Sequence, residues 1–225
     1  MPLARKHGWG GKRAGAGRPR KDGVRAPPGV PHVRRPKLNP VHPVAITLKV
    51  RREVWNLRYG RSVRLLRRAL AASRARDDFR VVHFAILSNH LHLITEAADL
   101  PALSRGVQAL EIRLARAMNR AMERRGAVFA DRFHAHVLRT PREVANARRY
   151  VLDNLNIHRR RAGLGPRSDP DPLTSERMGA CAMPPSTWLL RVGWQRRPRA
   201  GVPAANHAPL LQLLREPSPG PRAGR

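Results

Sequence analysis

Two histidines separated by one residue, His90 and His92, are the side chains of this sequence with the clearest potential for chemistry. They belong to segment 88–94, Ser-Asn-His-Leu-His-Leu-Ile. In a strand, successive side chains alternate between faces, so both imidazoles point to one side and Leu91 and Leu93 to the other. Two adjacent imidazoles suit a divalent metal ion, because histidine is its commonest protein ligand. Two half-exposed sheet histidines without a ligand satisfy the same spacing.

A tyrosine and an asparagine form a second arrangement with chemical potential. The sequence holds two tyrosines, Tyr59 in a loop-like stretch and Tyr150 in a helical pattern with Asn154 four residues on. Residues at i and i+4 of a helix share a face. If this helix lies over the histidine face of a sheet, the phenol and an amide oxygen approach the imidazole pair together.

The elements that must position these residues follow from apolar periodicity and turn signals. A long helix is indicated by an apolar stripe at helical spacing: Leu103, Val107, Leu110, Leu114 and Met118. The full set of expected elements is strand 43–50, helix 61–76, strand 79–87, strand 90–96, a helix from Pro101 to near Gly126, extended stretch 128–138, and a helix from Pro141 to about Arg161. This order is typical of an α+β, ferredoxin-like antiparallel sheet with helices on one face and a C-terminal tyrosine-bearing helix.

The charge balance predicts a polyanionic partner. The sequence has 45 Lys and Arg against 15 Asp and Glu, a formal net charge of +30. Such a surface favours nucleic acid, because phosphate contacts release counterions. Ribosomal or chromatin-like binding fits this balance equally well. The single Cys181 permits no internal disulfide and no apolar run has the length of a membrane span, so we expect a cytoplasmic, nucleoid-associated protein without a membrane partner.

Composition also divides the chain into three regions. Residues 1–40 are rich in Gly, Pro, Lys and Arg and are predicted to form a disordered basic arm. Residues 41–165 are predicted to form the folded domain. Residues 166–225 are predicted to be a Pro/Arg-rich, mostly irregular extension, within which Trp188-Leu189-Leu190 docks as a short helix.

A short motif in the arm has two interpretations. Gly17-Arg18-Pro19-Arg20-Lys21 is similar to the core of an AT-hook, which would place Arg18 and Arg20 in an A·T minor groove. We prefer the simpler interpretation of a nonspecific phosphate-binding tail, because five residues of biased composition carry little information.

Two motifs together resemble a known family. Segment 89–94, Asn-His-Leu-His-Leu-Ile, resembles the Asn-His-hydrophobic-His motif of HUH single-tyrosine DNA transposases, which include insertion-sequence and REP-associated tyrosine transposases. Segment 149–154, Arg-Tyr-Val-Leu-Asp-Asn, resembles the family's helix that carries the nucleophilic tyrosine and, four residues on, a third metal ligand. The resemblance covers residues 42–165. The chain departs from the family in having Leu87-Ser88 in place of Met-Pro, and Leu155 in place of proline after Asn154.

The resemblance implies a role for each matched residue. Tyr150 would be the nucleophile, and His90, His92 and Asn154 would hold Mg²⁺ or Mn²⁺, leaving positions for water and phosphate oxygens. The implied activity is transposition through nicking and rejoining of DNA, with a covalent 5′-phosphotyrosine intermediate and a free 3′-hydroxyl. The expected substrate is single-stranded or hairpin DNA. Both homodimers with an exchanged tyrosine helix and monomers occur in this family.

Further basic residues and a second histidine pair lie near the matched motifs. Four arginines are candidate phosphate contacts because of their sequence proximity to the motifs: Arg132, Arg139, Arg148 and Arg149. His134 and His136 repeat the spacing of the first pair but lack its sequence context, and the last strand of a ferredoxin-like sheet is not adjacent to the hairpin strand. We therefore interpret them as backbone contacts to DNA or as sheet residues.

Two other functions stay open at this point. A related HUH nuclease of the replication or relaxase type would share the chemistry. A nucleic-acid-binding module or transposase relic without catalysis would need only the basic charge and the sheet.

Overall fold

The computed structural model of the chain describes residues 37–196. The predictions for the basic arm, including Arg18 and Arg20, lie outside the described residues except at 37–40. A turn of helix that the sequence predicts at 210–214 also lies outside them. No helix within 37–196 is long and apolar enough to cross a membrane.

A four-stranded antiparallel sheet is the centre of the fold. Its strands are β1 (Val44–Lys49), β2 (Phe79–Ile86), β3 (His90–Ala97) and β4 (His134–Val137), in the spatial order β2-β3-β1-β4. Helices follow β1 and β3 in the chain, and a tight turn at Leu87–Asn89 joins β2 to β3. This order and connectivity confirm the predicted ferredoxin-like α+β class.

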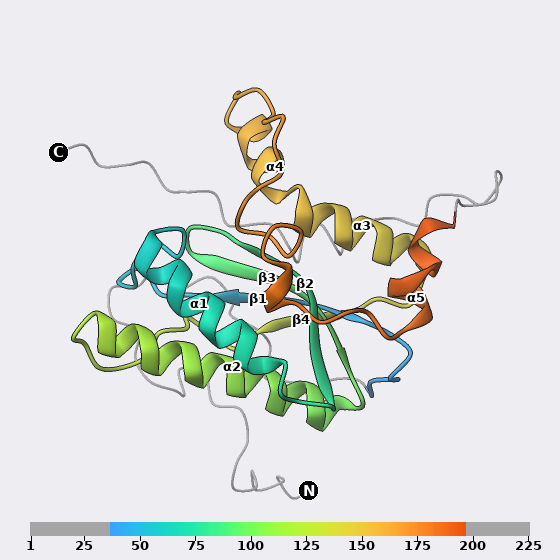
Figure 1. The fold of residues 1–225 in the computed structure, drawn as a ribbon, viewed down its shortest axis with the longest axis horizontal. Coiled ribbons are helices and arrows are strands. Elements are labelled where there is room, and N and C mark those ends of the chain that lie inside the picture. Colours follow the sequence, from blue (N-terminus) through green and yellow to red (C-terminus); the bar gives the residue numbers. More distant parts are fainter. Residues whose placement is uncertain (1–36, 197–225) are drawn as a thin grey trace, which may run out of the picture. The chain divides into compact units, whose positions relative to one another are not determined.

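Two helices cover one face of the sheet (Figure 1). They are α1 (Gly60–Ser73) and α2 (Leu100–Ala121), and the predicted apolar stripe of α2 is fully buried against the strands. The helix α2 begins after Asp99, whose carboxylate accepts a hydrogen bond from the backbone of Ala102 at 2.6 Å. Close contact is possible because Gly106 faces Phe79, where any Cβ would overlap the phenyl ring.

The opposite face carries the tyrosine helix. Helix α3 (Pro141–Leu152) begins with a capping box in which Thr140 and Glu143 each satisfy a backbone N–H of the other. A second apolar cluster fills the space between α3, the sheet and the short helix α5 (Trp188–Arg191), with Ala45, Ile94, Val144, Ala147, Val151, Leu189 and Leu190 among its members. The α1/α2 layer and α3 therefore enclose the sheet from both sides (Figure 1).

The tyrosine helix is broken where the sequence predicts continuity. Helix α3 ends at Leu152, and a new helix, α4 (Asn154–Arg161), begins after Asp153, whose φ of −100° and ψ of 14° leave the helical region. Adjacent Asp and Asn side chains compete for backbone hydrogen bonds and so favour helix ends. Asn154 is therefore the first residue of α4 and does not belong to the helix that carries Tyr150.

Other element boundaries also differ from the prediction. Helix α1 ends at Ser73, and α2 ends at Ala121 because Glu123 adopts a left-handed conformation with φ of 50°. The extended stretch 128–138 contributes only four strand residues, since β4 pairs with β1 at Val44–Thr47 alone.

Residues 166–196 form a C-terminal strap that crosses the free edge of β2. Backbone N–H groups of Ile86, Ser175 and Met183 pair across this edge at 2.8–2.9 Å. The strap contains η1 (Gly179–Cys181), α5 and η2 (Gly193–Gln195). Its docking confirms the predicted short helix at Trp188–Leu190, and it shields an edge strand that would otherwise expose unpaired backbone groups.

Two charged side chains attach the strap. The buried Asp171 carboxylate accepts two hydrogen bonds from the Arg58 guanidinium, at 2.8 and 2.9 Å. The carboxylate of Glu96, at the end of β3, accepts hydrogen bonds from the backbone N–H and hydroxyl groups of Ser186 and Thr187, at 2.7–2.8 Å. Charge-assisted hydrogen bonds are stronger than those between neutral groups, so these bonds hold the strap firmly against the sheet.

Candidate metal and tyrosine site

The two histidines of β3 meet at their Nε2 atoms. The Nε2 atoms of His90 and His92 are 3.0 Å apart, and the rings are nearly perpendicular with centroids 4.6 Å apart. Both residues are buried, at 3 % and 1 % exposure, so the interpretation as half-exposed sheet histidines is wrong. Helix α3 and the second apolar cluster cover the sheet face that the predicted fold, with helices on one face, leaves exposed.

The outer nitrogens of both rings are already engaged. Asn89 Oδ1 lies 2.7 Å from His90 Nδ1, and Thr47 Oγ1 lies 3.0 Å from His92 Nδ1. An amide oxygen only accepts, so His90 carries its proton on Nδ1 and presents a lone pair at Nε2. A hydroxyl both donates and accepts, so Thr47 supports either tautomer of His92. Hydrogen bonds of this kind orient metal-binding histidines in known sites.

The distance between the Nε2 atoms fits a shared cation. Metal–nitrogen bonds of about 2.1 Å that meet at a right angle place two nitrogens about 3.0 Å apart. A right angle is the cis angle of octahedral coordination, the geometry preferred by Mg²⁺. Without a cation, the same distance suits a hydrogen bond from His92 Nε2–H to His90 Nε2.

The ionisation of His92 also favours ligation. Burial lowers the pKa of His92 well below its usual value of 6.5, and electrostatic interaction with His90 and His158 lowers it further. The neutral imidazole, which is the form that binds metal, therefore predominates at neutral pH.

Tyr150 reaches the histidine pair from α3. Its ring contacts the ring of His92 edge-on, with centroids 5.2 Å apart and an interplanar angle of 73°. The residue is 4 % exposed, and Ala147 and Val151 pack beside it in the cluster beneath α3. The structure thus brings together three of the four site residues predicted from sequence.

Asn154, the fourth predicted residue, is buried and lacks polar partners. It is 1 % exposed, and neither its amide nitrogen nor its amide oxygen has a hydrogen-bond partner within residues 37–196. Burying an amide without hydrogen bonds costs about 1–3 kcal/mol for each unpaired group. Such a cost is offset when the oxygen serves as a ligand.

The position of Asn154 follows from its neighbours along the helices. Tyr150 contacts His92, and His158, four residues beyond Asn154, is close enough to His92 to influence its pKa. Asn154 and His158 lie four residues apart within α4 and so share one face of that helix, which places Asn154 on the face turned toward His92. Two imidazole nitrogens and an amide oxygen are donor types that suit a hard divalent cation, and the described chain contains no group of three His, Cys, Asp or Glu side chains that could hold one.

Sequence reasoning missed two residues that act on the pair. Thr47 was inconspicuous because its partner, His92, is 45 residues away and is placed opposite it only by strand register. His158 continues the four-residue spacing of Tyr150 and Asn154, and that spacing was a detectable signal.

The second histidine pair lies apart from the first. His134 faces Thr47 across β4 and β1, while Thr47 faces His92 across β1 and β3. One full strand therefore separates His134 from His92, a backbone distance of about 9–10 Å. This topology confirms the prediction that the strand of the second pair is not adjacent to the hairpin strand of the first.

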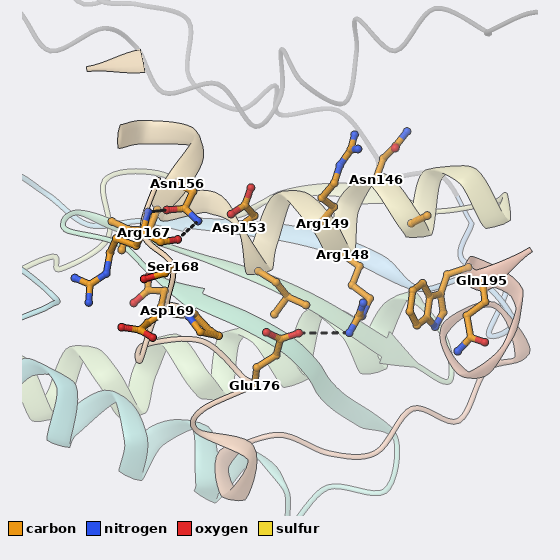
Figure 2. Close-up of a pocket in the computed structure, with 16 residues that line it drawn as sticks. Asn146, Arg148, Arg149, Asp153, Asn156, Arg167, Ser168, Asp169, Glu176 and Gln195 are labelled. Carbon is orange, nitrogen blue, oxygen red and sulfur yellow. Dashed lines mark hydrogen bonds and ion pairs between the residues drawn. The ribbon is translucent and has the colours of Figure 1, made fainter. Parts of the chain in front are cut away.

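The predicted arginine contacts occupy different surroundings. Arg132, Arg139 and Arg149 are exposed. Arg148 instead stacks over Trp194, 4.2 Å from the ring centroid, and lies 3.5 Å from a carboxylate oxygen of Glu176. Figure 2 shows Arg148 directed toward Glu176 while Arg149 points away to the other side of α3. The structure thus gives Arg148 a role in attaching the strap.

A cleft of about 620 Å³ lies between α3 and the strap (Figure 2). Its lining combines basic and acidic side chains, including Arg148, Arg149, Arg167, Asp153, Asp169 and Glu176. The cleft does not contain the histidine pair, which is buried on the sheet side of α3.

Comparison with known proteins gives structural matches only. No family model matches the chain, and no curated protein matches its sequence. One similar solved structure is described as a "REP associates tyrosine transposase bound to a REP hairpin", with 18 % identity over 60 % of this chain and 75 % of that one, at a TM-score of 0.46. Another is a "putative transposase" from Deinococcus radiodurans, with 14 % identity over 63 % of this chain and all of that one, at a TM-score of 0.37. The function proposed below rests on the side chains of this chain.

Proposed function

We propose that the protein is a metal-dependent tyrosine transposase that nicks and rejoins single-stranded or hairpin DNA. The observation that carries this proposal is the contact of the Tyr150 ring with one of two imidazoles whose Nε2 atoms lie 3.0 Å apart, together with a buried, unpartnered amide at Asn154. Tyr150 lies edge-on to His92 from α3, and Asn154 is the first residue of the next helix, α4. A tyrosine that merely packed in a core would not require this polar surrounding.

The chain's own residues would hold the cation and place the nucleophile. His90, His92 and Asn154 would bind Mg²⁺ or Mn²⁺, which supplies Lewis-acid polarisation of a phosphate oxygen when bound. Tyr150 Oη would attack the scissile phosphorus, forming the O–P bond of a 5′-phosphotyrosine as the bond to the 3′-oxygen breaks. The phenol gives up one proton and the leaving 3′-hydroxyl gains one, so the overall step neither consumes nor releases protons.

Reversal of the same step would rejoin DNA. The phosphotyrosine bond retains the energy of the original phosphodiester, so a 3′-hydroxyl of another strand displaces Tyr150 without ATP. The formal charge of +30 favours DNA as the substrate. Tyr150 is 4 % exposed on the sheet side of α3, which disfavours attack on an intact duplex and favours single-stranded DNA or the unpaired part of a hairpin.

A covalent adduct tests the proposal. The full-length protein is incubated with end-labelled hairpins, copied from palindromes that flank its gene, in the presence of Mn²⁺. We expect a labelled protein band on a denaturing gel, and its loss on addition of a chelator. Binding without any adduct, across the whole panel of hairpins, would instead support a nucleic-acid-binding module without catalysis.

A further inference from the structure

A lysine side chain lies directly beside the histidine pair. Lys49, the last residue of β1, is the register partner of His90 on β3. Side chains of directly opposed residues in an antiparallel pair lie on the same face of the sheet, with Cβ atoms about 5 Å apart. The hydrogen bond between Thr47 and His92, two residues along both strands, confirms this shared face. Lys49 therefore adjoins the proposed metal site.

The backbone around Lys49 is held on both sides. Its carbonyl oxygen accepts a hydrogen bond from the N–H of Ala130 at 2.9 Å. The N–H of the next residue, Val50, donates to the carbonyl oxygen of Asn89 at 2.9 Å, and the Asn89 side chain in turn contacts His90. The position of Lys49 relative to His90 is thus fixed by the same residue that orients the imidazole.

The ammonium group of Lys49 has no partner within residues 37–196. The side chain is exposed, and it makes no hydrogen bond or ion pair with another described residue. By contrast, the buried polar groups around it are engaged: Asn89 with His90, and Thr47 with His92. An exposed ammonium on a held backbone, beside the histidine pair, is available for an anionic ligand.

The residue type is also unusual for this chain. The sequence contains only five lysines against 40 arginines, and Lys49 is the only lysine in any helix or strand of the described part. Lysine presents a compact ammonium with three donors, whereas arginine presents a wide planar fork. A compact cation suits a position beside a metal that shares the same phosphate.

We propose that Lys49 is a catalytic residue that donates a hydrogen bond to a non-bridging oxygen of the scissile phosphate. This inference rests on the proposed function and adds a second positive group on the side of the phosphate next to His90. Negative charge on the non-bridging oxygens must be stabilised as Tyr150 attacks, and a preorganised donor there acts where charge develops. No proton is transferred to or from Lys49 in this role.

Single-turnover cleavage with Mn²⁺ separates this role from general DNA binding. We expect Lys49→Ala to lower the rate constant for adduct formation about 100-fold, the scale expected for loss of one such donor, while Kd for the hairpin changes little. Lys49→Arg should recover only part of the rate, because it keeps the charge but presents a wide planar group in place of the compact ammonium. Arg64→Ala, which removes an exposed cation from α1 on the other side of the sheet, is the matched control and should cleave like wild type.

A substrate modification identifies the oxygen. A methylphosphonate at the scissile position replaces one charged non-bridging oxygen by a methyl group. If Lys49 contacts that oxygen, Lys49→Ala should cause almost no further loss on this substrate. The full loss should return when the methylphosphonate is moved one linkage away. Thermal unfolding of each variant checks that the fold is intact.

The outcomes that overturn the inference are distinct from those that overturn the proposed function. A wild-type rate in Lys49→Ala, a loss confined to Kd, or an equal loss on both methylphosphonate substrates would exclude the role of Lys49 while leaving the tyrosine chemistry in place. Absence of any adduct with the wild-type protein would overturn the proposed function and this role with it.

Discussion

The ring of Tyr150 meets the ring of His92 edge-on, with centroids 5.2 Å apart, although the two residues belong to elements 58 positions apart in the sequence. This contact is made within one chain, through the packing of α3 on its own sheet. It places the proposed nucleophile and a proposed metal ligand together before any substrate binds, and preorganisation of this kind lowers the entropic cost of reaction.

Tyr150→Phe removes one oxygen atom and keeps the ring that packs under α3. We expect the free energy of unfolding and the affinity for hairpin DNA to stay close to wild type, while the covalent adduct disappears. Denaturing gels with end-labelled hairpin and Mn²⁺ measure the adduct. Tyr59→Phe changes an exposed tyrosine far from the pair in sequence and serves as the control. An adduct that formed in Tyr150→Phe but not in Tyr59→Phe would identify Tyr59 as the nucleophile instead.

His92→Gln should abolish metal binding, because it removes one of the two converging Nε2 atoms. In the wild-type protein, Mn²⁺ at 100 times its Kd should raise the free energy of unfolding by about 2.7 kcal/mol. Calorimetric titration and thermal unfolding with and without Mn²⁺ measure both effects. His134→Gln should retain both, since β1 separates His134 from the site. Loss of metal binding in His134→Gln but not in His92→Gln would instead assign the metal site to β4.

Asn154→Leu should affect stability and metal binding in opposite directions. Without metal, replacing a buried, unpartnered amide by an apolar group of similar size should raise the free energy of unfolding, by about 1–2 kcal/mol. The extra stabilisation by Mn²⁺ should be lost. Urea unfolding with and without Mn²⁺ measures both quantities. A less stable variant in the absence of metal would show that the amide has structural partners in solution.

Thr47→Val should weaken metal affinity about 10- to 100-fold, the scale seen when partners of metal-binding histidines are removed. The substitution keeps the shape of the side chain and removes the hydroxyl that contacts His92 Nδ1. Thr47→Ser retains the hydroxyl and should restore the affinity. Calorimetric titration with Mn²⁺ is the measurement, and equal affinities in the Val and Ser variants would argue against orientation by Thr47.

Stability should fall as the pH is lowered from about 6.5 toward 4. Burial lowers the pKa of His83 to about 4, with Arg148 adding to the effect. The unfolded chain, in which the pKa is near 6.5, therefore binds the proton first, and the folded state loses stability between the two values. The shift corresponds to about 3 kcal/mol. Unfolding measured across this pH range should show a shallower slope for His83→Gln. The buried His92 makes the free energy of unfolding depend on pH in the same direction, and its contribution should remain in the His83→Gln variant.

Local pattern was sufficient for much of the fold and for most of the candidate site. Alternation along β3 placed His90 and His92 on one face, whereas the predicted continuous helix through Tyr150 and Asn154 is broken at Asp153. The apolar stripe of α2 was identified in full. These features depend on periods of two and 3.6 residues, which are determined by backbone geometry within a single element.

Tertiary structure decided what surrounds those residues. Thr47 and Lys49 join the site only through strand register, and register depends on how β1 and β3 pair across more than 40 residues. Burial of the histidines depends on α3, which is held in place by the strap through Trp194, Leu189 and Leu190. The sequence by itself determined which side chains could share a face. The packing of distant elements decided which of these side chains come into contact, become buried and lack a hydrogen-bond partner. Contacts between distant elements leave no periodic pattern in the sequence, so the sequence alone does not predict them.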